Sequence, residues 1–164
     1  MPTSTAVGVA GVMTLVAQKS FASNAVEFAA LSGDYRYVLY LALTCADVTI
    51  GKIELNGETT ATNYYDQFMN TDNAVYTAAR ENANNCVIGL AGGNAVKIDV
   101  FRDESGYLRY FALCSGSPTN PILRTYAGGK SNATATEVTA IKILKTATGT
   151  SLAGTATLYK MAAV

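Results

Sequence analysis

The fold is decided by residues 96–114, which read VKIDVFRDESGYLRYFALC. Residues 96–101 place Val or Ile at every second position, the period of a strand with one buried face. Residues 103–106, Asp-Glu-Ser-Gly, form a turn sequence, and residues 108–114 return as a second apolar run. A short Gly-ended loop between two such runs predicts an antiparallel hairpin.

The same two-residue period recurs along the rest of the chain, interrupted by turn pairs such as Asn56-Gly57 and Gly128-Gly129. With the hairpin, this gives roughly eight to ten strands at the spacing of sandwiches and barrels. We therefore expect an all-β fold, an antiparallel β-sandwich of jelly-roll-like form. The further strands are expected at residues 12–19, 25–30, 35–42, 49–55, 86–90, 121–126, 137–144 and 155–161.

Helix signals are confined to one patch, residues 70–84. Asp72 or Asn73 could cap a helix there, and the alanines at 74, 78 and 79 favour it. The sequence thus predicts one short helix at most.

A chain of 164 residues favours one domain. We expect residues 1–19 to be an extended N-terminal arm with a possible first strand, and residues 20–164 to be a single β-sandwich domain. Residues 1–10 are small and uncharged, and in an assembly such an arm can add to a neighbour's sheet edge.

Charge excludes some partners. Lys plus Arg equals Asp plus Glu at 12 each, and charged residues make up 15% of the chain. A neutral chain offers no electrostatic footprint for nucleic acid or an anionic membrane. The first basic residue, Lys19, follows the apolar N-terminal run, which is the wrong order for a secretory signal. We expect no nucleic acid and no membrane partner.

The usual catalytic and metal-binding patterns are missing from the sequence. It has no His, which removes Ser-His-Asp and Cys-His catalysis and His-based metal sites. Gly92-Gly93 lacks the Lys-Ser/Thr of a phosphate-binding loop. Cys45, Cys86 and Cys114 lie in apolar stretches and are expected to be buried free thiols. We expect no catalytic residue, no cofactor and no metal.

Carboxylates are the remaining route to catalysis, because a glycosidase needs two of them across a cleft. Glu54 and Asp99 lie in predicted strands and could point into one groove. The alternative is that both are solvated outward positions between apolar neighbours, and we favour it. The other candidates are Glu27, Glu58, Asp66 and Glu137.

Aromatic residues gather at residues 63–68, Asn-Tyr-Tyr-Asp-Gln-Phe, which we expect in a loop. Tyr64 and Tyr65 could stack on a sugar, anchor an interface, or close one end of the sandwich. Packing at the end of the sandwich is favoured over interface contact, and interface contact over ligand contact.

Three segments in order resemble a family of small β-sandwich structural proteins of tailed phages. They are residues 34–41 (DYRYVLYL), residues 53–65 (IELNGETTATNYY), and residues 138–143 (VTAIKI) followed by 151–159 (SLAGTATLY). Three features depart from the family: Lys160 replaces its usual terminal Gly, Glu58 stands where Asp is frequent, and the chain has no Trp. The resemblance implies a sandwich that oligomerises on a virion, and it implies no catalytic residue.

These observations predict a structural virion protein, most simply an outer capsid decoration, cement or head-fibre protein. Its partners would be the major capsid protein or other virion proteins, and further copies of itself, a trimer being favoured by capsid symmetry. Its location would be the virion, assembled in the host cytoplasm. The alternative is a receptor-binding tip of a tail fibre that holds a host surface glycan near Tyr64 and Tyr65 or near residues 115–121. A glycan-degrading enzyme is the least favoured reading.

Overall fold

The structure is a computed structural model, and it describes residues 12–22, 24–45, 49–72, 75–89, 92–116, 122–146 and 151–162. Twelve strands and a single turn of 3-10 helix, η1 (Ala61–Asn63), lie in these ranges. Residues 1–10 of the expected arm lie outside them. Within these ranges, no helix is long and apolar enough to span a membrane.

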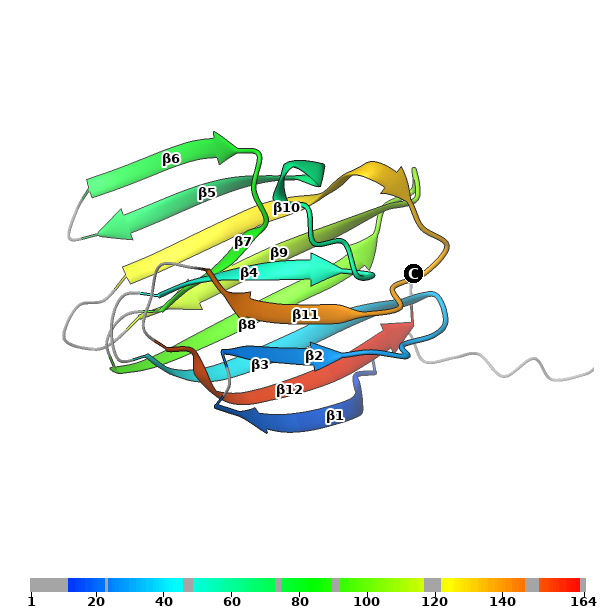
Figure 1. The fold of residues 1–164 in the computed structure, drawn as a ribbon, viewed down its shortest axis with the longest axis horizontal. Coiled ribbons are helices and arrows are strands. Elements are labelled where there is room, and N and C mark those ends of the chain that lie inside the picture. The colour runs from blue at the N-terminus through cyan, green and yellow to red at the C-terminus, as the bar shows by residue number, and fades with distance from the viewer. Residues whose placement is uncertain are drawn as a thin grey trace, which may run out of the picture.

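The strands form two antiparallel sheets that pack face to face (Figure 1). At one edge of the larger sheet β1 (Thr14–Phe21) pairs with β12 (Ala153–Ala162), so Thr14 lies opposite Lys160. The smaller sheet has the order β2 (Ala25–Phe28), β11 (Ile141–Lys145), β4 (Thr49–Leu55), β7 (Asn85–Gly89). The larger has the order β1 (Thr14–Phe21), β12 (Ala153–Ala162), β3 (Tyr35–Cys45), β8 (Gly92–Arg102), β9 (Tyr107–Ser115), β10 (Ile122–Thr134), β5 (Tyr64–Asp72), β6 (Val75–Glu81).

The strand order is that of a jelly roll with two inserted hairpins. Without β5–β6 and β9–β10, the sheets run β1-β12-β3-β8 and β2-β11-β4-β7. This is the interleaved order of an eight-stranded double Greek key. The two hairpins add to the free side of β8 and widen one sheet to eight strands, while the other keeps four. The expected all-β sandwich of jelly-roll-like form is therefore confirmed.

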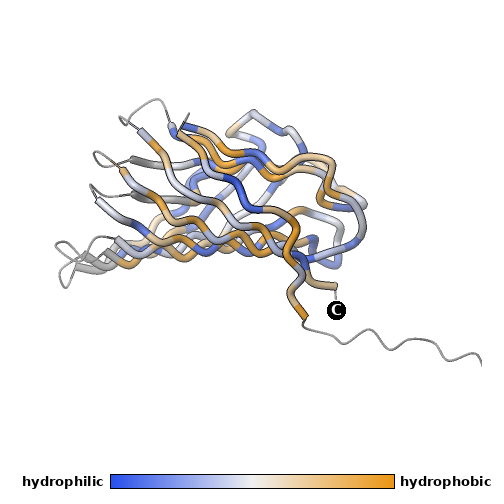
Figure 2. The backbone as a smooth tube through the Cα atoms, turned by 90° about the horizontal axis from the view of Figure 1, so that it is seen from below, coloured by the Kyte–Doolittle hydropathy of each residue, from blue (hydrophilic) through white to orange (hydrophobic). Residues whose placement is uncertain are grey.

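The core lies between the sheets. Leu39 and Ile98 of the larger sheet and Ile53 and Ile143 of the smaller are inaccessible to solvent. Figure 2 shows the alternation of apolar and polar residues along the strands that produces this inner layer. Each such side chain contributes about 1.5–3 kcal/mol by leaving water, so the core rather than local propensity holds the strands in place.

The described part of residues 70–84, the patch that could have held the one short helix, is not helical. Residues 70–72 end β5 and residues 75–81 form β6, with Phe68 opposite Ala79 and Met69 opposite Ala78 in the β5–β6 ladder. Alanine favours a helix in isolation, but pairing with β5 overrides this weak preference.

Two strand boundaries also differ from the expectation. Residues 63–68 were expected in a loop, but β5 begins at Tyr64. Gly128-Gly129 was expected to end a strand, yet β10 continues to Thr134. A Cβ at Gly128 would lie 2.6 Å from the Tyr110 hydroxyl. Glycine there makes room for the neighbouring phenol and does not break the strand.

Candidate interaction surface

The outer face of the eight-stranded sheet, which points away from the smaller sheet, carries two cross-strand rows of nearly uncharged side chains. Every second residue of a strand points to this face, and the ladder registers align them. We call the two rows together the two-row surface. One row is Gln18, Thr157, Tyr40, Lys97, Leu113, Thr125, Met69 and Ala78, and the other is Ser20, Thr155, Ala42, Ala95, Ser115 and Leu123.

Large apolar side chains stand exposed on this surface. Tyr40 is 39% exposed, Leu113 38%, Leu123 47% and Met69 64%, and the neighbouring Phe111 is 43% exposed. Monomeric proteins rarely expose contiguous apolar patches beyond a few hundred Å². Such a surface on a folded β-sandwich is therefore typical of a contact site.

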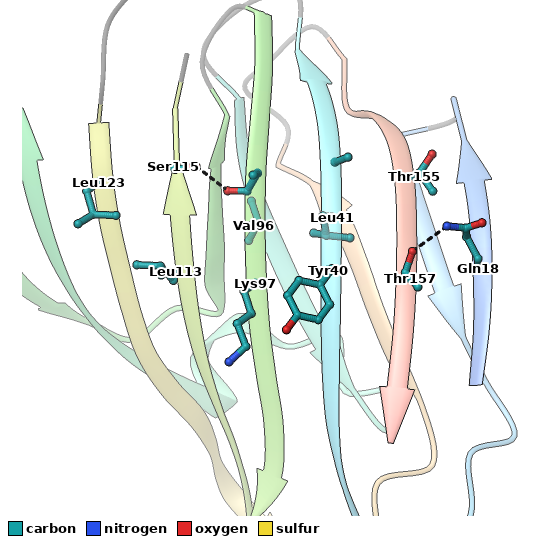
Figure 3. A pocket seen from close by; sticks show the side chains of 12 residues that line it. Gln18, Tyr40, Leu41, Val96, Lys97, Leu113, Ser115, Leu123, Thr155 and Thr157 are labelled. Atoms are coloured by element: carbon teal, nitrogen blue, oxygen red, sulfur yellow. Dashed lines mark hydrogen bonds between the residues drawn. The ribbon is translucent and has the colours of Figure 1, made fainter. Parts of the chain in front are cut away.

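Two grooves run along the surface, and residues of β9 and β10 line both of them. The first, of about 490 Å³, lies over β12, β3 and β8 and is lined by Tyr40, Leu113 and Leu123 among others (Figure 3). The second, of about 480 Å³, lies over β5 and β6 and includes Met69 and Phe111. Both grooves are shallow and mostly apolar, so they suit side chains of a protein partner.

Lys97 is the one charged residue of the two-row surface, and its charge is compensated. Its Nζ lies 3.1 Å from Asp99 Oδ2, and Arg36 Nη2 lies 3.2 Å from Asp99 Oδ1. Asp99 is 5% exposed, so this carboxylate sits between two cations under its neighbours. The ion pairs draw the Lys97 charge toward Asp99 and leave its aliphatic stem over the groove.

The structure does not bring Glu54 and Asp99 together. Glu54 stands between the buried Ile53 and Leu55 on the small sheet, and Asp99 between the buried Ile98 and Val100 on the large one. The two carboxylates therefore face opposite outer surfaces of the sandwich. They are also less solvated than expected, because Glu54 is 8% exposed and accepts a hydrogen bond from Lys142 Nζ at 3.0 Å.

Tyr64 closes the end of the sandwich, as favoured. Its ring is buried, its hydroxyl accepts a hydrogen bond from Leu55 N–H at 2.8 Å, and it donates to the Glu58 carbonyl at 3.0 Å. Burial raises the pKa of the Tyr64 phenol. Tyr64 is thus inaccessible to a sugar.

Tyr65 points to the opposite face of β5. Its ring lies 5.4 Å from the Arg109 guanidinium and 5.8 Å from that of Arg80. Arg109 also forms an ion pair with Asp103 at 2.6 Å. Of the two tyrosines, Tyr65 alone keeps an outward position. Most of the other predicted glycan loop, residues 117–121, lies outside the described residues.

The structure also places the three cysteines and the Gly92-Gly93 pair that the sequence analysis considered. Cys45, Cys86 and Cys114 are buried free thiols, as expected, and burial raises the pKa of Cys86. Gly92-Gly93 begins β8. In the described part of the chain, no three acidic or cysteine side chains gather in a way that could hold a metal ion.

Sequence reasoning missed the two-row surface. The sequence signal for this surface lies in residues 35–42 and 108–114, where apolar side chains occur at both odd and even positions of the strand. That pattern predicts a strand buried on both faces. The smaller sheet covers one face only, and the other is left open.

Comparisons with protein-family models, with curated proteins and with solved structures found no match to this chain. The fold and its surface define a coarse class, a jelly-roll β-sandwich whose larger sheet exposes apolar side chains on its outer face.

Proposed function

We propose that this protein is a non-enzymatic structural protein of a particle, and that the particle is the virion of a tailed phage. Its place is the outside of the capsid, as a decoration, cement or head-fibre protein. Its partners are the major capsid protein or other virion proteins, together with further copies of itself.

The observation that carries the proposal is the two-row surface. Leu113, Leu123 and Met69 expose apolar area that folding leaves uncovered, and assembly is the process that covers such area. A catalytic cleft needs convergent polar groups around a concavity. The two grooves instead have mostly apolar walls and few charges.

The assignment to a phage particle is supported by the three sequence segments that resemble tailed-phage sandwich proteins. Two of them form strands at the centre of the fold. Residues 34–41 contribute the first part of β3, and residues 151–159 contribute most of β12, the strand that pairs with β3. The two segments pair with each other from Ala156–Leu41 to Tyr159–Val38. Most of the first and third segments therefore lies in paired strands, while residues 56–63 of the second connect β4 to β5.

Particle labelling tests the proposal. Antibody raised against the purified chain is applied to particles from a lysate that produces it, and bound gold is located by electron microscopy. Particles from a strain lacking the gene are the control. Label at regular positions on the capsid supports the proposal, and label on the tail moves the protein to that part of the virion. Absence of label from both intact and opened particles rejects it.

A further inference from the structure

We propose that the two-row surface packs against the same surface of a second copy of this chain, across a two-fold axis that runs along the strands between β8 and β9. This inference deepens the proposed function by naming the partner of that surface. It differs from the three-fold association expected from capsid symmetry, because a surface that packs against itself generates a two-fold axis.

Charge favours a second copy as the occupant. Lys97 is the surface's one charged residue and is already paired with Asp99 at 3.1 Å. The other charged residue in the groove linings is Arg80, which lies over the Tyr65 ring at 5.8 Å. A strongly acidic or basic partner would find few groups to pair with and would lose hydration on docking. The chain itself carries a neutral face of matching character, and each copy supplies one.

The size of the surface fits a dimer. The two rows, with Phe111, Ala127 and Tyr159 beside them, cover roughly 550 Å² of flat sheet at the usual strand and residue spacings. Exposed side chains make the accessible area larger than this projection. A stable interface buries about 800 Å² on each partner, and the exposed side chains bring the accessible area of this face toward that value.

The relief of the surface is self-complementary under this axis. The axis exchanges strands that lie symmetrically about the line between β8 and β9, so β9 and β10 of one copy meet β8 and β3 of the other. Leu113 and Leu123 line the β9–β10 side of the groove of about 490 Å³, and under this axis they face the β3–β8 side of the same groove in the other copy. Lys97 of one copy meets Leu113 of the other, so like charges do not face each other.

Sheet twist supports the same arrangement. All β-sheets twist in the same sense, so two copies of one sheet can stack face to face with aligned strands at about −30°, as the sheets of a sandwich do. All eight strands overlap under the proposed axis, from β1 against β6 to β8 against β9. The result is a four-layer stack with an inner double layer.

The test measures the mass of the full chain in solution. Size-exclusion chromatography with light scattering is run on wild type, Leu113→Glu and Leu123→Glu over a range of concentrations. Val12→Glu is the matched control, because Val12 is 59% exposed and apolar but lies outside the two-row surface. Circular dichroism of each variant checks that the sheet is retained.

We expect wild type and Val12→Glu to be dimers. A charge at the centre of an interface weakens association by about 30-fold or more, so both leucine variants shift toward monomer. A monomeric wild type at every concentration overturns the inference and assigns the surface to a different partner, while particle labelling remains able to support the proposed function. A dimer or trimer that both leucine variants leave intact also overturns it, since the contact then lies elsewhere.

Discussion

The Asp66 carboxylate accepts a hydrogen bond from the backbone N–H of Asn85 at 2.9 Å in a position that solvent does not reach. Its other oxygen has no hydrogen-bond partner among the described residues. Burial raises the pKa of Asp66 to about 6, the hydrogen bond lowers it and the nearby Glu81 raises it further. The hydrogen bond of Asp66 links β5 to the start of β7, but burying the ionised carboxylate lowers the free energy of unfolding.

This cost predicts a pH dependence of stability. The unfolded chain releases the Asp66 proton near its ordinary pKa of 3.8, and the folded chain releases it near 6. The contribution of Asp66 is therefore fully present below about pH 4, falls as the pH rises to about 6, and is then lost. Two pKa units correspond to about 3 kcal/mol.

Asp66→Asn keeps an oxygen for the Asn85 N–H and removes the titration. We expect urea unfolding at pH 4, 5 and 7 to show a smaller loss of stability with rising pH than in wild type. Glu104→Gln, at an exposed turn position, is the control and should follow wild type. Equal pH dependence in Asp66→Asn and wild type would contradict this role.

Tyr64→Phe removes the hydroxyl that bridges Leu55 and Glu58. The buried Leu55 N–H is left without its acceptor, so the free energy of unfolding should fall by about 1–3 kcal/mol. Tyr65→Phe keeps the ring that the arginines contact and should change stability by less than about 0.5 kcal/mol. Chemical denaturation measures both, and equal effects would show that the ring, not the hydroxyl, closes this end.

Gly154 lies where β12 passes close to β3. Its φ is +151°, and a Cβ there would overlap the Ala42 carbonyl oxygen. Gly154→Ala should therefore destabilise the fold by about 3 kcal/mol or more, because strained backbone and a backbone clash add. Gly93→Ala is the matched control, since its Cβ would meet no atom within 4 Å. Thermal unfolding that ranks the two alike would refute this account.

The three thiols should be unreactive in the folded chain. Cys45, Cys86 and Cys114 are buried, and only an exposed thiolate reacts readily. We expect Ellman's reagent to titrate fewer than one thiol per native chain, and all 3 once guanidinium unfolds it. Rapid reaction of a native thiol would show that one of these sites opens to solvent.

The sequence alone was sufficient to predict most strands, because alternation reports burial directly. It was misleading where a small residue had a tertiary reason to be present. Ala78 and Ala79 favour a helix locally but pair with Met69 and Phe68. Gly128 resembles a strand stop but accommodates the Tyr110 phenol. Neither reason is visible before the neighbouring strands are placed.

The division of strands between sheets was beyond sequence reasoning. Alternation shows that a strand has a buried face but not which sheet it joins. The hairpins β5–β6 and β9–β10 therefore gave no sign that both would extend the same sheet. The two-row surface results from that extension, and Leu113, Leu123 and Met69 all lie on the added strands.

The pairing of Thr14 with Lys160 places the beginning of β1 beside the end of β12. The first and last strands of the described chain are therefore neighbours in the sheet. The same arrangement of strands could be connected in a different chain order if these two strands were linked directly. A short linker across this corner, with new ends cut in a surface turn, gives a circular permutant of the sandwich. A peptide joined directly before Thr14 and one joined directly after Ala162 would both start from this edge of the sheet.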